Sequence, residues 1–249
     1  MANRRSVPQI VESISPASCT VDHRLEVLRG LPFFHDLSHE RLEEINRQFR
    51  SYDVEAGATI YMSGDRTERL YVVAHGRVKL LRHSASGEDT VLDILATGEM
   101  FGTLAALGDV TYPDTAEAQT FSCVLGIGAH DFQAILERSP DVALRVLGIV
   151  AKRLQEAHTT ISQISTTPAE ARVAAALVKL AGKLGVPDER GTLIQTRISR
   201  QDIAAMTGTT TETASRVMSQ LRRDGVIESG RQWIVVIDLP RLTEIAEMA

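Results

Sequence analysis

The sequence predicts an α+β protein in which an antiparallel β-sandwich is joined by a long helix to a winged helix-turn-helix domain. Three observations predict this: short apolar runs punctuated by glycine, a long helix with a seam of apolar residues, and a helix-turn-helix-hairpin pattern near the C-terminal end. We expect four segments: a flexible tail over 1–21, an effector-sensing sandwich over 22–139, a dimerisation helix over 140–166 and a winged domain over 167–249.

The composition is that of an ordinary globular protein. The chain has 249 residues, enough for two domains with separate cores, and 43% of them are hydrophobic. Its opening residues lack the apolar core of a secretory signal and no apolar run is long enough to cross a bilayer, so we expect a cytoplasmic protein without membrane contact. A net charge of -5 argues against indiscriminate coating of nucleic acid, but it is compatible with a local basic surface.

The first half of the chain predicts two short helices and then a sheet. Residues 25–49 show helical apolar spacing that Pro32 interrupts. Short apolar runs closed by glycine follow, at 59–62, 70–73, 78–81 and 90–95. Strands this short and regular are typical of an antiparallel sandwich, whose interior can hold a small ligand.

A long helix is predicted from Pro140 to about Ser165, before Pro168 interrupts the chain. Its apolar residues lie alternately three and four positions apart, which is the spacing of a coiled-coil seam. They are Leu147, Val150, Leu154, Ala157, Ile161 and Ile164. A single helix lying on its own sheet would also use such a stripe. We favour a homodimer interface because the seam continues up to the C-terminal domain.

Near the C-terminal end, the sequence predicts a helix that ends at Gly208, a polar turn and a second helix. Glu212, Ser215 and Arg216 project together from one side of the second helix near its N-terminus. Arginine can donate two hydrogen bonds to guanine, and glutamate can accept one from cytosine. The hydroxyl of serine can donate or accept a hydrogen bond. These three residues can therefore contact base edges in the major groove of DNA.

A plainer interpretation is that the threonines before Glu212 cap the helix and that Glu212 and Arg216 form a surface ion pair. The residues that follow favour DNA binding. Gly225 ends the helix, and residues 226–237 predict two strands around a glycine turn, which is a wing.

The chain has two cysteines, Cys19 and Cys123, which are far apart and form neither a CxxC pair nor a disulfide framework. We expect unremarkable thiols, with a redox pair as the minor alternative. A [4Fe-4S] cluster normally takes four thiolates and is not expected. The histidines of the sheet, His75 and His83, lack the close spacing of a metal cupin, so a cupin-like enzyme is the weak alternative and we expect no catalytic residues and no metal site.

The order of elements resembles the CRP/FNR family of bacterial transcription regulators. Three stretches carry the resemblance: IYMSGDRTERLYVVAHGRVKLL at 60–81, GEMFGTLAALGD at 98–109 and ISRQDIAAMTGTTTETASRVMSQLRRDGVI at 198–227. The resemblance implies a cyclic-nucleotide-binding-type sandwich of jelly-roll form. It also implies a homodimer that binds a palindromic operator in double-stranded DNA and recruits RNA polymerase.

Within the family, ETASR at 212–216 is similar to the pattern of the FNR branch, which implies TTGA-type half-sites contacted by Glu212, Ser215 and Arg216. The resemblance implies contacts to the phosphate backbone by a second set of residues: Arg200, Gln201, Thr210 and Thr213. Residues 112–127 are similar to the FNR and nitric-oxide-responsive branches, although the cysteine cluster of FNR is absent. We therefore expect an effector- or redox-gated activator of anaerobic or nitrogen-oxide metabolism.

The effector remains open at this stage. In cAMP-binding relatives a glutamate holds the ribose and an Arg-Ser pair holds the cyclic phosphate, whereas this chain has Thr103, and Tyr112 with Pro113, at those places. A buried phosphate without a strong donor is costly, so cAMP is not expected. An organic metabolite that controls a catabolic pathway is one alternative, and haem is another. The iron would take a ligand from one of several residues, none singled out by spacing: His23, His35, His75, His83, His130, His158, Met62 or Met100.

Overall fold

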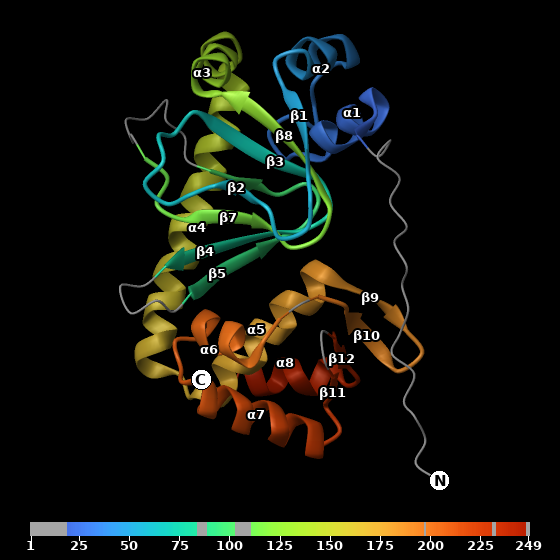
Figure 1. The fold of residues 1–249 in the computed structure, drawn as a ribbon, viewed down its shortest axis with the longest axis vertical. Coiled ribbons are helices and arrows are strands. Elements are labelled where there is room, and N and C mark those ends of the chain that lie inside the picture. Colours follow the sequence, from blue (N-terminus) through green and yellow to red (C-terminus); the bar gives the residue numbers. More distant parts are fainter. Residues whose placement is uncertain (1–18, 84–88, 103–110, 197, 231–232, 248–249) are drawn as a thin grey trace.

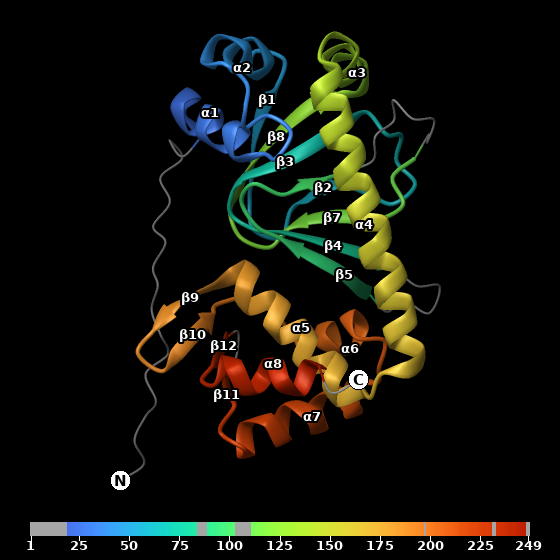
Figure 2. The same cartoon turned by 180° about the vertical axis from the view of Figure 1, so that it is seen from behind.

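The computed structural model describes residues 19–83, 89–102, 111–196, 198–230 and 233–247. It confirms the predicted fold class: a β-sandwich forms one lobe, a winged helix-turn-helix domain forms the other, and a long helix runs beside the sandwich down to the second lobe (Figures 1 and 2). Within the described part of the chain, no helix is both long and apolar enough to span a membrane.

Two short helices precede the sandwich, as predicted. They are α1 (Val21–Gly30) and α2 (His39–Asn46), and each begins after a hydroxyl side chain, Thr20 or Ser38, that accepts a hydrogen bond from the first turn. The first helix begins at the end of the segment that we expected to be a flexible tail, and the described part of the chain includes Cys19 and Thr20 of that segment.

The described part of the sandwich consists of two four-stranded antiparallel sheets, with strand orders β1-β8-β3-β6 and β2-β7-β4-β5. The strands are β1 (Arg50–Val54), β2 (Thr59–Tyr61), β3 (Arg69–His75), β4 (Val78–His83), β5 (Asp89–Leu95), β6 (Met100–Phe101), β7 (Thr115–Ala118) and β8 (Ser122–Gly128). Strands β2 to β5 confirm the four predicted runs. The turn from β3 to β4, which carries the chain from one sheet to the other, contains Gly76, whose φ of 85° disfavours any residue with a side chain.

Aromatic rings fill the space between the two sheets. The rings of Tyr61 and Tyr112 are stacked with centroids 3.7 Å apart, and those of Tyr71 and Phe101 are stacked at 5.2 Å. All four residues are buried, in one cluster with Val124 of β8 and other aliphatic side chains. The opposite face of the β1-β8-β3 sheet forms a second core with α1, α2 and the following helices.

A short helix, α3 (Ala129–Arg138), which the sequence did not indicate, leads into α4 (Pro140–Thr166). The bounds of α4 agree with the helix predicted over 140–166. Val142 and Val146 on one side of α4 are buried in the sandwich core, whereas Leu147 and Leu154 on another side are exposed. The helix thus packs on its own domain and also leaves an apolar face uncovered.

The second lobe has the predicted helix, helix and hairpin. Its elements are α5 (Ala169–Leu184), β9 (Gly185–Asp188), β10 (Gly191–Ile194), α6 (Arg200–Met206), α7 (Thr211–Arg223), β11 (Ile227–Gly230), β12 (Trp233–Val236) and α8 (Leu239–Glu247). The wing strands β11 and β12 belong to a four-stranded sheet of order β11-β12-β10-β9. The sequence pattern did not indicate β9, β10 or α8.

The structure corrects the prediction for the cysteines. Cys19 and Cys123 are joined by a disulfide across a sequence separation of 104 residues, with their Cα atoms 6.2 Å apart. The prediction was wrong because spacing along the chain carries no information on this contact. The fold places the residue just before α1 against the strand β8, and α1 lies on the neighbouring strand β3.

Candidate DNA-binding surface

Local sequence features fix the two helices of the helix-turn-helix. Helix α6 begins with a reciprocal cap: Ser199 accepts from the backbone of Asp202, and the Asp202 carboxylate accepts from the backbone of Ser199. The chain then reverses through Gly208, whose φ is 59°. Helix α7 is preceded by its N-cap, Thr210, whose hydroxyl accepts a hydrogen bond from the backbone of Thr213. Both helix starts are therefore held by side chains within the segment itself.

Arg172 of helix α5 holds the turn between α6 and α7. Its Nε donates to the carbonyl of Thr207 at 2.8 Å, one terminal nitrogen donates to Gly208 at 3.2 Å, and the other donates to Thr167 at 2.6 Å. Thr167 lies at the junction of α4 and α5. One guanidinium therefore connects the end of the long helix to the turn that orients α7.

Helix α7 has a buried face and a solvent face. Ala214, Met218 and Leu221 are buried in the core of the winged domain. Glu212 and Arg216 are exposed and Ser215 is half-buried, which follows from their positions between the apolar ones. The structure thus brings the three predicted base-contacting residues to one accessible surface.

The plainer interpretation of this segment is correct in one respect. Thr210 caps α7, and its hydroxyl also donates to the hydroxyl of Thr213 at 3.0 Å. By contrast, Glu212 and Arg216, which both lie in the described part of the chain, form no ion pair with each other. The side chains that would contact bases are therefore not engaged with one another.

The residues predicted to contact phosphates lie around the starts of the two helices. Gln201 and Thr210 are exposed. Arg200 is partly buried and donates to the Ser229 hydroxyl of β11 at 3.0 Å. Burial, and then the nearby charge of Arg222, lower the pKa of Arg200. Two like charges held close together favour the approach of an anion.

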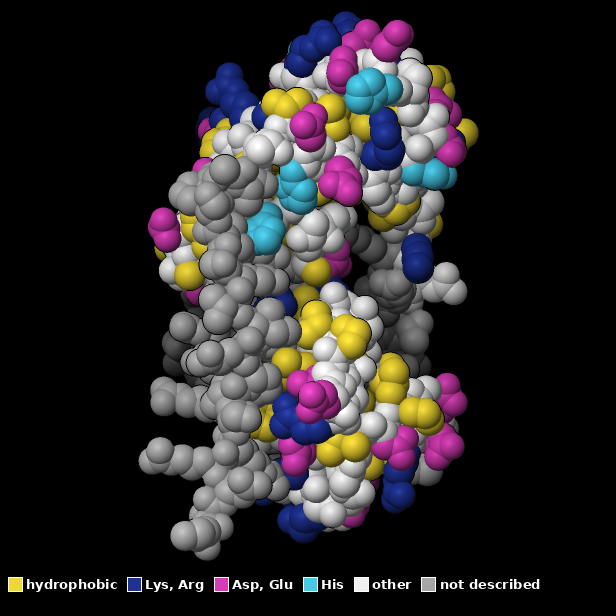
Figure 3. Space-filling model, turned by 90° about the vertical axis from the view of Figure 1, so that its right-hand side faces the viewer, with side chains coloured by type: hydrophobic (Ala, Val, Ile, Leu, Met, Phe, Trp, Pro, Cys, Tyr) yellow, Lys and Arg dark blue, Asp and Glu magenta, His cyan; other side chains and the backbone are white. Residues whose placement is uncertain are grey.

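Positive and negative side chains are interspersed on the molecular surface that Figure 3 shows. On the face shown in Figure 3, the visible Lys and Arg side chains lie among Asp and Glu side chains over both lobes. This face therefore has the mixed character expected from the net charge of -5.

The predicted dimer seam on α4 is exposed along the part that the structure describes. The side chains of Leu147 and Leu154 are 62% and 58% accessible, and Val150 is also exposed. Leu144, one turn earlier, extends the stripe and was not predicted. The side chains of Ala157, Ile161 and Ile164 lie outside the described residues.

At the expected position of a cyclic phosphate, the structure has a buried ring. Tyr112 is 3% exposed, and its hydroxyl donates to the carbonyl of Arg69 at 2.9 Å. The adjacent ring of Tyr61 is hydrogen-bonded through its hydroxyl to Asp114 at 2.9 Å. Thr103, the residue at the ribose position, lies outside the described residues.

The candidate iron ligands are dispersed over the described part of the molecule. His23 donates to the carbonyl of Ala74 at 2.9 Å, and His35 pairs with Asp36 at 2.8 Å. The remaining described ones are separate: Met62, His130 and His158 are exposed, and His75 and Met100 are partly buried. The side chain of His83 lies outside the described residues. The group of metal-type ligands that does converge is Cys19, Asp53 and Cys123.

A β-sandwich joined by a long helix to a winged helix-turn-helix domain is the architecture of a class of DNA-binding regulators. Residues 171–245 match the Crp-like helix-turn-helix domain, and residues 52–139 match the cyclic nucleotide-binding domain. The chain is 33% identical over 219 residues to the cyclic AMP receptor protein of Thermus thermophilus, which covers 88% of this chain and 98% of that protein. The chain belongs to the CRP/FNR family of DNA-binding transcription regulators.

Other similar proteins agree with this assignment. The global nitrogen regulator of Synechococcus elongatus is 27% identical over 216 residues, 86% of this chain and 95% of that protein. A solved transcriptional regulator of the CRP/FNR family from Thermus thermophilus is 28% identical with a TM-score of 0.66, over 80% of this chain and 98% of that one. FixK2 of Bradyrhizobium japonicum shares the fold, with a TM-score of 0.70, 24% identity, and coverage of 81% and 98%. The first two of these proteins are named as regulators, in agreement with a transcription regulator that is not an enzyme.

Proposed function

We propose that this protein is an effector- or redox-gated regulator that binds, as a homodimer, to palindromic operators with TTGA-type half-sites. Glu212, Ser215 and Arg216 contact the bases. The observation that carries the proposal is the position of these side chains on the solvent face of α7, near its N-terminus and free of a mutual ion pair. This is the end of a recognition helix that enters the major groove.

Phosphate contacts flank this set. Arg200 and Arg222 bring two positive charges close together beside the wing residue Ser229. Gln201, Thr210 and Thr213 lie on the same two helix starts. Such contacts set the register of the protein on DNA and supply salt-dependent affinity, whereas the choice of sequence rests with α7.

Dimerisation through α4 follows from its exposed stripe. Leucines at 144, 147 and 154 with Val150 present apolar surface that a second copy would bury. Two copies joined along α4 would carry two recognition helices. These read both half-sites only when their separation matches about one turn of DNA, about 34 Å.

We place the protein in the FNR-like branch, as a cytoplasmic activator that recruits RNA polymerase in anaerobic or nitrogen-oxide metabolism. The ETASR sequence at 212–216 supports the branch. Two observations bear on the effector. Tyr112 is buried at the position where a cyclic phosphate would need a cation, which argues against cAMP. Cys19 and Cys123 are the two cysteines of the chain, which is fewer than the four thiolates that a [4Fe-4S] cluster normally takes.

A binding titration tests the proposal. Fluorescence anisotropy with a labelled TTGA-N-TCAA palindrome should show saturable binding that a scrambled duplex lacks. Arg216→Ala should weaken binding by about 1 to 3 kcal/mol and reduce discrimination at the guanine position. Arg241→Ala is the matched control, because this exposed arginine lies on α8, which packs against α5. Equal affinity for palindrome and scrambled duplex, or an unchanged Arg216→Ala variant, would contradict the proposal.

A further inference from the structure

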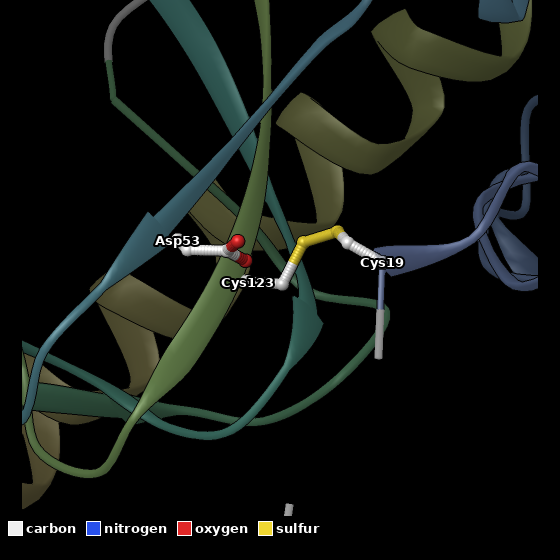
Figure 4. Close-up of side chains that lie close together, drawn as sticks. All are labelled: Cys19, Asp53 and Cys123. Carbon is white, nitrogen blue, oxygen red and sulfur yellow. A yellow bond between two sulfur atoms is a disulfide. The ribbon is translucent and has the colours of Figure 1, made fainter. Parts of the chain in front are cut away.

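Cys19 and Cys123 occupy a specific place in the sandwich. Cys19 lies just before Thr20, the N-cap of α1, and Cys123 lies on β8, between β1 and β3 in the sheet (Figure 4). Their Cα atoms are 6.2 Å apart, a separation that allows a disulfide without movement of the backbone. These are the two cysteines of the chain, and no other thiol competes for either.

The surroundings of the two sulfur atoms differ. Cys123 is fully buried in the core beneath α1, whereas Cys19 is partly exposed. Asp53 of β1 is the strand partner of Cys123, and its carboxylate lies within 4.8 Å of both sulfur atoms. Figure 4 shows this exposed carboxylate beside the bonded pair. Cys19 is therefore the more accessible residue of the pair, and Cys123 is enclosed by the core.

We propose that Cys19 and Cys123 form a reversible redox site that senses oxidants of the hydroperoxide class and adjusts operator binding. The inference rests on the proposed function, because a regulator acting on cytoplasmic DNA is in a compartment where structural disulfides are rare and thiols are kept reduced. A disulfide in that setting is a response to oxidation.

The chemistry is a two-electron oxidation. The Cys19 thiolate attacks one oxygen of the hydroperoxide and breaks the O–O bond, which gives a sulfenic acid at Cys19 and releases hydroxide or alkoxide. The Cys123 sulfur then attacks the Cys19 sulfur, forms the S–S bond and expels the hydroxyl group as water. In total, two thiols and one hydrogen peroxide give one disulfide and two waters. A cellular dithiol returns the two electrons by exchange.

The carboxylate of Asp53 sets how readily this happens. A negative charge within 4.8 Å of the sulfur atoms disfavours a second negative charge there, and the thiolate is the reactive form. Asp53 therefore slows oxidation of the thiols, so that the disulfide forms only during sustained exposure to an oxidant.

A continuous core links the site to the dimerisation helix. Cys123 and Leu28 of α1 belong to the same buried cluster as Val142 and Val146 of α4. Helix α1 is also fastened to β3 through the hydrogen bond from His23 to the Ala74 carbonyl. The disulfide fixes the chain immediately ahead of α1 on β8, and reduction releases it. The redox state thereby changes how firmly α1 is held in the core that packs against α4. Helix α4 in turn leads to the winged domain.

The first experiment tests the chemistry on the full-length protein. After reduction and removal of the reductant, treatment with hydrogen peroxide should remove two hydrogen atoms from the intact mass, and a tryptic digest should contain one peptide pair joined through Cys19 and Cys123. Cys19→Ser should give no such pair, and Asp53→Asn should form it faster than the wild type. Absence of the linked pair at complete consumption of thiols would overturn the proposal. The proposal would also be overturned if the reduced protein bound zinc stoichiometrically and kept it in the presence of peroxide.

The second experiment measures operator affinity of the reduced and oxidised forms with the same labelled duplex. We expect the two values to differ by about fivefold or more, and Cys19→Ser, which leaves the buried Cys123 in place, to keep the reduced value after peroxide treatment. Equal affinities of the two forms would overturn the redox inference while the proposed function stands. If neither form of any variant binds the operator, the proposed function fails whatever the thiol chemistry shows.

Discussion

The ammonium group of Lys183, on helix α5 of the winged domain, lies 2.9 Å from the carboxylate of Glu99 in the sandwich. The same group lies 3.1 Å from Asp93 of β5, and only 12% of the Lys183 side chain is accessible. Val91 and Ile94 of β5 are buried in the same cluster as the apolar residues of the winged domain. The sandwich therefore contacts the DNA-binding lobe directly, in addition to the connection through α4.

This contact makes Lys183 a test of coupling between the lobes. Lys183→Met should lower the free energy of unfolding by roughly 1 to 3 kcal/mol, because two partly buried carboxylates lose their shared cation. Lys179→Met is the control: its ammonium is 3.9 Å from Asp93, its side chain is 62% accessible, and its loss should cost less than about 1 kcal/mol. Urea denaturation of both variants measures the difference, and equal losses would contradict the role of Lys183.

Substitution of Arg172 should weaken DNA binding although this residue lies on α5, away from the solvent face of α7. Arg172→Lys keeps the charge but cannot reach the carbonyls of Thr167, Thr207 and Gly208 together. We expect a stability loss of about 1 to 3 kcal/mol and weaker operator binding. Thermal unfolding and anisotropy report the two effects, with Arg241→Lys on the exposed side of α8 as the neutral comparison. An unaltered Arg172→Lys protein would show that the turn is held by other contacts.

Two glycines should respond in opposite directions to the same substitution. Gly208→Ala should destabilise the protein by about 1 to 2 kcal/mol, because its φ of 59° is unfavourable for a residue with a Cβ atom. Gly182→Ala lies in helix α5 with no atom within 4 Å of the added methyl group, and should stabilise by about 0.5 to 1 kcal/mol. Denaturation midpoints decide the signs, and stabilisation by Gly208→Ala would refute the left-handed turn.

The tyrosines inside the sandwich should resist ionisation. Burial first, and then the neighbouring Tyr112, raise the pKa of Tyr71 to about 12, and burial raises that of Tyr61 as well. Since the folded state holds these protons more tightly, the associated stability is complete below pH of about 10 and is lost as the pH rises through about 12. Ultraviolet titration should show delayed phenolate absorbance that rises together with loss of the near-ultraviolet circular dichroism. Ionisation of every tyrosine near pH of about 10 in the folded protein would contradict this packing.

Local pattern predicted much of this molecule. Some features follow from residue spacing within a single helix, strand or hairpin, so the sequence alone indicates them. They are the glycine-closed runs that form β2 to β5, the stripe on α4 and the hairpin after Gly225. The position of Glu212, Ser215 and Arg216 on the solvent face of α7 follows from helical spacing in the same way.

What the sequence left out depends on contacts between distant segments. The strand β9 reads Gly-Val-Pro-Asp, which lacks alternation because it lies at the edge of its sheet. The bond between Cys19 and Cys123 and the contact of Lys183 with Glu99 arise only when separate elements are brought together. Neither has a local periodic signature, and composition does not reveal them.

Two copies joined along α4 should present two recognition helices to one operator. Sedimentation velocity of the protein mixed with a single palindromic duplex measures how many chains bind. We predict a complex of two chains per duplex. A Leu147→Asp, Leu154→Asp double variant should lose both dimerisation and operator binding, because the aspartates would place like charges in the seam where these leucines are now exposed. A complex that contains one chain per palindrome, with unchanged affinity in the double variant, would contradict this prediction.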